Sequence, residues 1–221
     1  MANDAPTFRS LVTHFTDFLT VAIHTILYER NIYPRTSFLS ARKYNFAVRQ
    51  SRHPKVCEWI NDAMAAVETE ILKGTVERVA VVVYNQALKP TERYLFDLSR
   101  FPIVGAADAD VPLERKAADG TTVSVLPVVD IEEQFRATMS KLANCGTVLR
   151  PPPVDGTFTV AIELKSDGQA PVSHPQPWMP VEAATRQGAT ELQSRRTHPL
   201  RAVVAGDLMF ESWIEETPAA D

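Results

Sequence analysis

Cysteine and glycine are both scarce in this sequence. The two cysteines, Cys57 and Cys145, lie far apart, so they indicate neither a disulfide framework nor a zinc-binding motif. We expect two reduced thiols in an intracellular protein. The 8 glycines among 221 residues are scattered and form neither GxGxxG nor GxxxxGKS/T, the loops that cradle nucleotide phosphates. A nucleotide cofactor is therefore not indicated.

Positive charge is also in deficit, with 23 Lys and Arg against 27 Asp and Glu, a formal charge of -4 and a pI near 5.8. Proteins that bind phosphate backbones directly usually present a basic surface, so direct nucleic-acid binding is not expected. Residues 1–7 lack the basic-then-apolar pattern of a signal peptide. We also expect no apolar run as long as a membrane span, and hence no membrane association and a cytosolic or nuclear location.

Apolar periodicity predicts the secondary structure. Helices are predicted over residues 8–30, 54–72 and 129–144. Strands are predicted over residues 76–84, 91–99, 157–164 and 201–215, the last broken near 205–207, with a loop over 101–127. With 45% hydrophobic residues, the chain is long enough for one well-buried domain. The predicted fold class is α+β, with three helices packed on one face of a mainly antiparallel sheet.

Titratable side chains form no constellation that indicates catalysis or metal binding. The five histidines share no metal-ligand spacing: His14, His24, His53, His174 and His198. Glu132 and Glu133 lie near the start of a predicted helix, where carboxylates complement the helix dipole. We therefore predict no catalytic residue, no metal and no cofactor. An enzyme of unrecognised class is the alternative, which a metal or cofactor in purified protein would support.

A long stretch over residues 166–200 has little periodicity and is rich in Pro, Gln, Thr and Arg. Structureless connections of this length are uncommon inside compact domains and are usually functional or disordered. This one contains Trp178, in the sequence QPWMP, and a buried aromatic supplies much of an interface's binding energy. We predict a loop that folds over a partner peptide, in a binding module. The alternative is that Trp178 only pins the loop to the protein body.

The last predicted strand has two different sides. One side carries Leu208, Phe210, Ser212 and Ile214, and the other carries Met209, Glu211, Trp213 and Glu215. If the first set packs on the core, Trp213 is displayed between two glutamates, as an aromatic anchor for a second partner. The alternative is that a bulge or a covering loop buries Trp213.

Several motifs together resemble the HORMA-domain family. They are the ILYERNIYP sequence of residues 26–34, the valine-rich run of 79–83, the YLFD sequence of 94–97, and the C-terminal segment called the safety belt in that family. The resemblance covers nearly the whole chain. It implies a single HORMA domain over residues 1–221, with a core of about 8–165 and a mobile safety belt with C-terminal strands over about 166–216.

Two branches of that family compete. The spindle-checkpoint branch shares the LYxRxIYP element, and it remains the alternative, with mitotic regulators as partners. Other motifs are more similar to the accessory, non-catalytic subunit of translesion DNA polymerase zeta. They are KYN at 43–45, SRHP at 51–54, PP at 151–152 before GTFTV at 156–160, PW at 177–178, and WIEE at 213–216.

The resemblance to that branch implies a non-catalytic adaptor in the nucleus, and in the cytoplasm as well. Its safety belt would wrap a short proline-containing peptide of the polymerase's catalytic subunit, held by Trp178, Trp59 and Tyr33. Trp59 stands where the family often has Tyr.

Two further surfaces follow from the same resemblance. A surface for the translesion scaffold polymerase maps to Leu200, Glu211 and Trp213, where Glu211 replaces an amide and Trp213 a Tyr. Arg136 matches a helix arginine of HORMA–HORMA pairing, which implies a homo- or heterodimer; its alternative role is that of a solvated helix residue. The resemblance assigns no role to the expanded 101–127 loop.

Overall fold

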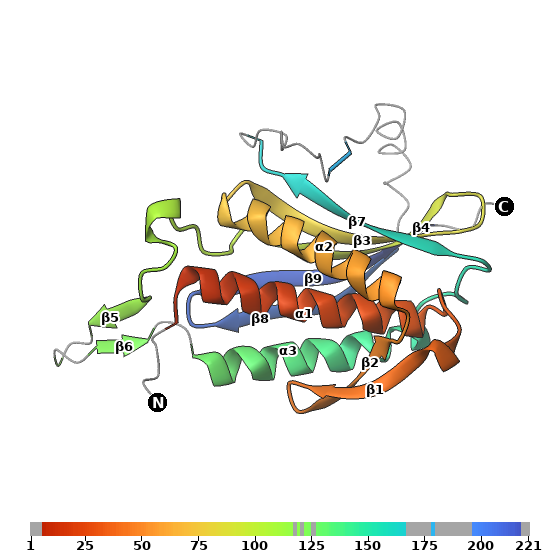
Figure 1. The fold of residues 1–221 in the computed structure, drawn as a ribbon, viewed down its shortest axis with the longest axis horizontal. Coiled ribbons are helices and arrows are strands. Elements are labelled where there is room, and N and C mark those ends of the chain that lie inside the picture. The colour runs from red at the N-terminus through yellow and green to blue at the C-terminus, as the bar shows by residue number, and fades with distance from the viewer. Residues whose placement is uncertain are drawn as a thin grey trace.

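The computed structural model describes residues 6–116, 119, 122–124, 127–166, 178–179 and 196–217, and Figure 1 shows their arrangement. The α-helices are α1 (Phe8–Glu29), α2 (Pro54–Leu72) and α3 (Val128–Leu142). The strands are β1 (Phe38–Lys43), β2 (Phe46–Ser51), β3 (Val76–Tyr84), β4 (Pro90–Asp97), β5 (Glu114–Lys116), β6 (Thr122–Ser124), β7 (Thr157–Leu164), β8 (Arg196–Ala205) and β9 (Leu208–Glu216). Short 3-10 turns occupy Arg35–Ser37, Ala106–Asp108 and Cys145–Thr147. The three predicted helices are thus confirmed.

Helix α1 is the centre of the fold and lies between α2 and α3 (Figure 1). It begins at a capping box, in which the Thr7 hydroxyl accepts the Ser10 N–H and the Ser10 hydroxyl accepts the Thr7 N–H. By length and composition α1 could cross a membrane, so the expectation that no segment is that long and apolar is wrong. However, 67% of its most apolar window is buried inside the protein, as in the core helix of a globular domain.

A five-stranded antiparallel sheet of order β7-β3-β4-β9-β8 forms the second layer. Alternate residues of each strand point to the same face of the sheet, and the residues on the face toward the helices are mostly apolar. Val81 of β3, Phe96 of β4 and Phe210 of β9 join α1 and α3 there, and Phe18 stacks on Phe135 at 4.5 Å. The expected α+β class is therefore confirmed, and α1 buries most of its surface between the sheet and the other helices, with only a polar strip that includes His14 and Asp17 exposed.

The opposite face of the sheet is partly open. A small apolar cluster of Ala80, Val82 and Leu95 lies on it, with Trp213 packed against the cluster. Around these residues runs a ladder of ion pairs. Arg78 contacts Asp97 at 2.8 Å and Glu163 at 3.0 Å, and Arg93 contacts Glu163 and Glu215. The hydrogen bond that Arg78 donates to the Asp97 carboxylate raises the pKa of the Arg78 guanidinium.

Two hairpins lie outside the predicted strands. β1 and β2 pair antiparallel, joined by Tyr44 and Asn45, which have positive φ angles of 52° and 53°. Such a turn favours Asn or Gly, and a tyrosine at its first central position conceals it from sequence analysis. β5 and β6 form a short hairpin inside the predicted 101–127 loop. The segment predicted over 201–215 as a strand broken near 205–207 is a hairpin of β8 and β9, and β8 begins five positions earlier, at Arg196.

The chain topology separates β7 from β8. These two strands lie at opposite edges of the sheet, so the segment that joins them must pass from one edge to the other. The edges are four strand spacings apart, or about 19 Å. Most of the predicted safety belt, residues 167–177 and 180–195, lies outside the described residues, and its predicted mobility stays a prediction.

Candidate peptide-binding site

The outer edge of β7 is the first part of the candidate site. β7 pairs with β3 and, within the described part of the chain, with no other strand. Its outward main-chain groups are therefore able to pair with an added strand. Phe158 and Ile162 point from β7 toward the main core, which fixes the orientation of that edge. This arrangement suits a peptide that binds as an additional strand.

The start of β7 is closely packed against the turn that follows α1. A Cβ atom at Gly156 would lie 2.9 Å from Pro153 Cγ, 3.0 Å from the Tyr84 carbonyl oxygen and 3.1 Å from Ile32 Cδ1. Only glycine fits this approach without displacement. Tyr33, the neighbour of Ile32, is half-buried against the core, and this burial raises the pKa of its phenol. The predicted site residue Tyr33 thus lies beside the turn that buttresses β7.

Trp59 projects from α2 toward the same strand. Its ring meets the Phe158 ring edge-on, with centroids 5.0 Å apart and an interplanar angle of 80°. The Trp59 residue is 43% exposed, which is unusual for so large an aromatic. An exposed indole beside an unpaired strand edge is a ready apolar contact for a peptide side chain.

Trp178 is half-buried and packs against the main core cluster, whereas the adjacent Met179 is 91% exposed. The Trp178 Nε1 atom is buried and has no hydrogen-bond partner among the described residues. A buried indole N–H usually finds an acceptor, and none lies among the described residues. No ring contact joins Trp178 to Trp59 or Tyr33 in the described ranges. The structure therefore brings Trp59 and the turn that contains Tyr33 to the start of β7, and it anchors Trp178 on the core.

The predicted second surface is divided between the two faces of the sheet. Glu211 is exposed, and Trp213 packs on the small outer cluster, where its Nε1 donates to Glu215 at 3.2 Å. Leu200 instead packs against the main core, at a bulge in β8 where the pairing register shifts. Trp213 is thus half-buried, which is neither the full display nor the full burial that the sequence analysis considered for it. Glu211 and Trp213 share a face, but Leu200 does not join them there.

Arg136 is half-exposed on α3 and forms an ion pair with Glu133, one turn away, at 2.5 Å. Such a surface pair contributes little to stability. The dimer contact assigned to Arg136 stays a prediction.

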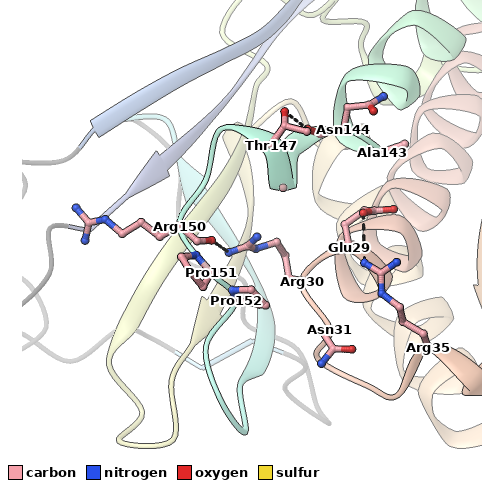
Figure 2. Close-up of a pocket in the computed structure, with 11 residues that line it drawn as sticks. Glu29, Arg30, Asn31, Arg35, Ala143, Asn144, Thr147, Arg150, Pro151 and Pro152 are labelled. Atoms are coloured by element: carbon pink, nitrogen blue, oxygen red, sulfur yellow. Dashed lines mark hydrogen bonds and ion pairs between the residues drawn. The ribbon is translucent and has the colours of Figure 1, made fainter.

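A polar pocket of about 470 Å³ lies elsewhere, between the end of α1 and the residues that follow α3 (Figure 2). Glu29 and Arg35 flank it on one side, and Arg150 lies on the other (Figure 2). None of the sequence-predicted site residues lines it. The described residues also contain no group of three or more His, Cys, Asp or Glu side chains able to hold a metal ion.

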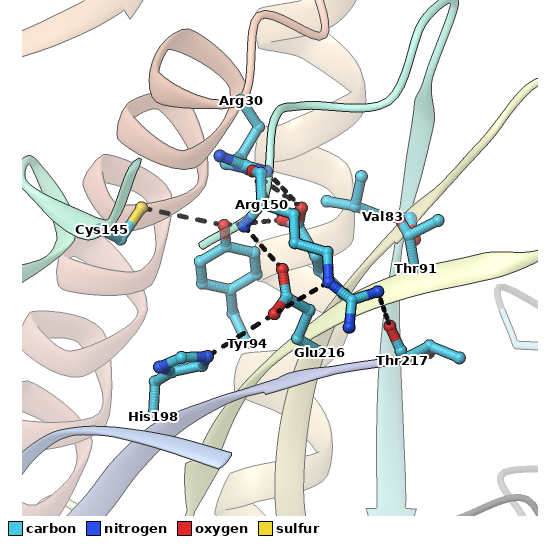
Figure 3. A network of polar contacts seen from close by, with 10 residues as sticks. Arg30, Val83, Thr91, Tyr94, Cys145, Arg150, His198, Glu216 and Thr217 are labelled. Carbon is cyan, nitrogen blue, oxygen red and sulfur yellow. Dashed lines mark hydrogen bonds and ion pairs between the residues drawn. The ribbon is translucent and has the colours of Figure 1, made fainter. Parts of the chain in front are cut away.

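A buried ionic network adjoins this pocket through Arg30, and it was not predicted from the sequence (Figure 3). Arg30 and Glu92 are 1% and 3% exposed, and both Arg30 Nε and Nη2 donate to the Glu92 carboxylate. Burial opposes the charge on Arg30, yet the hydrogen bond and charge of Glu92 raise the pKa of the guanidinium. Tyr94 also donates to Glu92, at 2.9 Å. This network fixes the end of α1 to β4.

These features define the class of protein. A HORMA domain model matches residues 12–197, and the chain belongs to the HORMA domain family. The resemblance noted from the sequence is thus confirmed. Among curated relatives, the chain is 32% identical over 213 residues to the DNA polymerase zeta processivity subunit of Schizosaccharomyces pombe, with 96% of each chain covered. It is 28% identical to the mitotic spindle assembly checkpoint protein MAD2B of Danio rerio, with 90% of this chain and 88% of that protein covered.

Solved structures show the same fold at much lower identity. A chain of the mitotic checkpoint complex superimposes with a TM-score of 0.70 at 15% identity, covering 95% of this chain and 99% of that one. The Caenorhabditis elegans HTP-2 protein, solved bound to a HIM-3 closure motif, gives a TM-score of 0.64 at 11% identity, with 97% and 93% covered. At such identities the likeness establishes the fold alone.

Proposed function

We propose that this protein is a non-catalytic adaptor subunit of translesion DNA polymerase zeta. It captures a short proline-containing peptide of the catalytic subunit and bridges it to a scaffold polymerase during DNA damage tolerance in the nucleus. One observation carries the proposal. The edge of β7 that no described strand pairs with lies beside the exposed Trp59. The segment leaving that edge must pass by way of the core-anchored Trp178 to reach the far edge of the sheet.

The mechanism combines strand addition with enclosure. A peptide pairs with the main chain of β7, so main-chain hydrogen bonds give affinity and side-chain contacts give selectivity. Trp59 and Trp178 supply apolar contacts, and prolines in the peptide reduce its ordering cost on binding. Closure of the connecting segment over the peptide makes dissociation wait for local opening. Release of the peptide is then slow even if the contact area is not large.

The comparisons lend support to this assignment and also to its alternative. The relative from Schizosaccharomyces pombe carries the name of a polymerase zeta processivity subunit and is similar over nearly the whole length. The HTP-2 structure shows a protein of this fold bound to a closure motif. The MAD2B names of other relatives support the alternative, a spindle-checkpoint HORMA protein that binds mitotic regulators.

Peptide capture separates the two candidates. We expect an immobilised proline-containing peptide from the central region of the polymerase zeta catalytic subunit to retain the purified protein. A checkpoint-regulator peptide of equal length should retain it far less. The reverse order of retention would replace the polymerase assignment by the checkpoint one. Retention by neither, with the fold intact by circular dichroism, would reject both.

Trp213→Ala tests the second surface. Because Trp213 lies on the outer face of the sheet, away from β7's outer edge, we expect peptide capture to be unchanged. Binding of the scaffold polymerase should weaken by about 2 kcal/mol, the scale of an interface hot spot. Calorimetry with each ligand measures both effects. A variant that binds the scaffold polymerase as tightly as the wild type would remove Trp213 from that surface.

A further inference from the structure

The β8–β9 hairpin carries an apolar patch on the side that faces away from the helices. Alternate residues of a strand point to opposite faces, and on the core side of the hairpin Val203, Phe210 and Ile214 are fully buried. The outer side is exposed or half-buried instead. We call its residues the outer patch: Pro199, Ala202, Val204, Met209, Glu211 and Trp213.

Strand pairing orders the outer patch into three rows, because residues directly opposite each other in a sheet share a face. Glu211 lies in the middle row, with an apolar row on either side. In one outer row Val204 is 53% exposed. Contiguous exposed apolar surface of this kind is typical of an interaction site. The three rows are Pro199–Trp213, Ala202–Glu211 and Val204–Met209.

Glu211 has no counter-charge inside the molecule. Its register partner on β8 is Ala202, and its register partner on β4 is a second carboxylate, Asp97. Like charges directly opposite in a sheet are destabilising. Arg78 donates to Asp97 at 2.8 Å and not to Glu211. No hydrogen bond or ion pair joins the Glu211 carboxylate to another residue in the described ranges.

The other carboxylates on this face of the sheet are compensated. Glu163 accepts hydrogen bonds from Arg78 and Arg93. Glu215 lies 3.4 Å from the Arg93 guanidinium and also accepts the Trp213 indole N–H. The exposed charge of Glu211, surrounded by apolar side chains, therefore attracts a cation from outside the molecule.

We propose that the outer patch docks a segment of a partner protein in which a lysine or arginine side chain lies between two apolar side chains. The cation meets Glu211. One apolar side chain covers Trp213, and the other covers Val204 and Met209. Trp213 and Met209 are four positions apart on β9, so the two apolar contacts lie about 13 Å apart. An aromatic anchor beside one charged contact is a common arrangement of interface hot spots.

A second copy of this chain does not offer such a segment through the same patch. A symmetric dimer would place the patch against itself, and the patch contains a carboxylate but no lysine or arginine. Like charges brought together across an interface oppose association. The arginines nearest along the face, Arg78 and Arg93, are already engaged by carboxylates.

The identity of the partner rests on the proposed function, whereas the chemistry of its docking segment does not. In the proposed function, the partner at this surface is the scaffold polymerase. Glu211 and Trp213 already belong to that predicted surface. Leu200 packs against the main core, so Val204 and Met209 replace it as the apolar part of the surface.

Calorimetric titration with the purified scaffold polymerase tests the cation contact. Glu211→Lys should weaken binding by at least about 30-fold, because it places a like charge against the partner's cation. Glu211→Gln keeps the size and removes the charge, so it should weaken binding about fivefold and reduce its dependence on salt. Asp62→Lys is the matched control. It makes the same change in net charge at an exposed position of α2 and should bind as the wild type does.

Val204→Ser tests the apolar part of the patch. The side chain is exposed in the free protein, so the fold should be retained by circular dichroism. Binding of the scaffold polymerase should weaken about tenfold, the effect of leaving one valine side chain uncovered. A lysine or arginine of the polymerase whose replacement by glutamate restores binding to Glu211→Lys identifies the contacting cation.

A peptide-display selection makes the test independent of the scaffold polymerase. A random peptide library is selected on the wild-type protein, and each binder is then tested against Glu211→Lys and Trp213→Ala. Peptides that require both residues should carry Lys or Arg between apolar residues. Peptides captured at the edge of β7 bind all three proteins and are thereby set aside.

Each result decides the inference. It is overturned if the scaffold polymerase binds Glu211→Lys as tightly as the wild type, or if Asp62→Lys weakens binding as much as Glu211→Lys does. A wild-type dimer that Val204→Ser dissociates, seen by analytical ultracentrifugation, would make the occupant a second copy and overturn it as well. If the polymerase does not bind the wild type, the selection decides. Peptides of the expected kind then uphold the patch and reject only its assignment to the scaffold polymerase, and their absence overturns the inference.

Discussion

Replacing Arg30 by methionine should lower the free energy of unfolding by about 3–5 kcal/mol. The guanidinium is 1% exposed and donates to both oxygens of Glu92, and its Nη2 also donates to the Arg150 carbonyl oxygen at 2.7 Å. Removing it leaves the Glu92 carboxylate buried without a counter-charge, opposite the second carboxylate of Glu216. Urea unfolding followed by circular dichroism measures the loss.

Two further variants serve as controls for the Arg30→Met measurement. Arg30→Met combined with Glu92→Leu removes both charges, so it should recover much of the lost stability. Arg136→Met breaks the exposed pair with Glu133 and should change stability far less. A loss below about 1 kcal/mol in Arg30→Met would mean that the buried pair is not a main tie between α1 and β4.

The helices and central strands could be predicted because burial imposes a period on their sequences. α1 is apolar nearly all round, and β3 is a run of valines, so each matches its place at the centre of a layer. The β1–β2 hairpin lacks such a signal. Its strands carry polar residues on their exposed sides, and its turn places Tyr44 in a conformation that tyrosine rarely adopts.

Part of the candidate site could be proposed from the sequence, and its role in peptide binding stays a prediction. Trp178 and Trp59 are large aromatics in conspicuous positions. The ionic network was not predicted because its partners, such as Arg30 and Glu92, are 62 residues apart in sequence. A signal was nevertheless present. Glu92 shares its strand face with Tyr94 and Phe96, and a carboxylate on a core-facing position requires a buried partner.

The position of Trp178 in the structure leads to the prediction with the largest effect on binding. Trp178→Ala should weaken binding of the proline-containing polymerase peptide by at least about 2 kcal/mol, or roughly 30-fold, while the fold is retained. Truncation removes an aromatic anchor packed on the core together with an indole N–H that has no partner among the described residues. Isothermal titration calorimetry measures the affinity, and circular dichroism measures the fold.

Matched variants separate the two contributions of Trp178. Trp178→Phe keeps an aromatic ring but removes the N–H donor, so its affinity should fall between those of the wild type and Trp178→Ala. Trp213→Ala is the control, because it removes the same side chain from the outer face of the sheet and should leave peptide affinity unchanged. Unchanged affinity in Trp178→Ala would refute its place in the site. Reduced stability with normal affinity would show instead that Trp178 only pins its segment to the core.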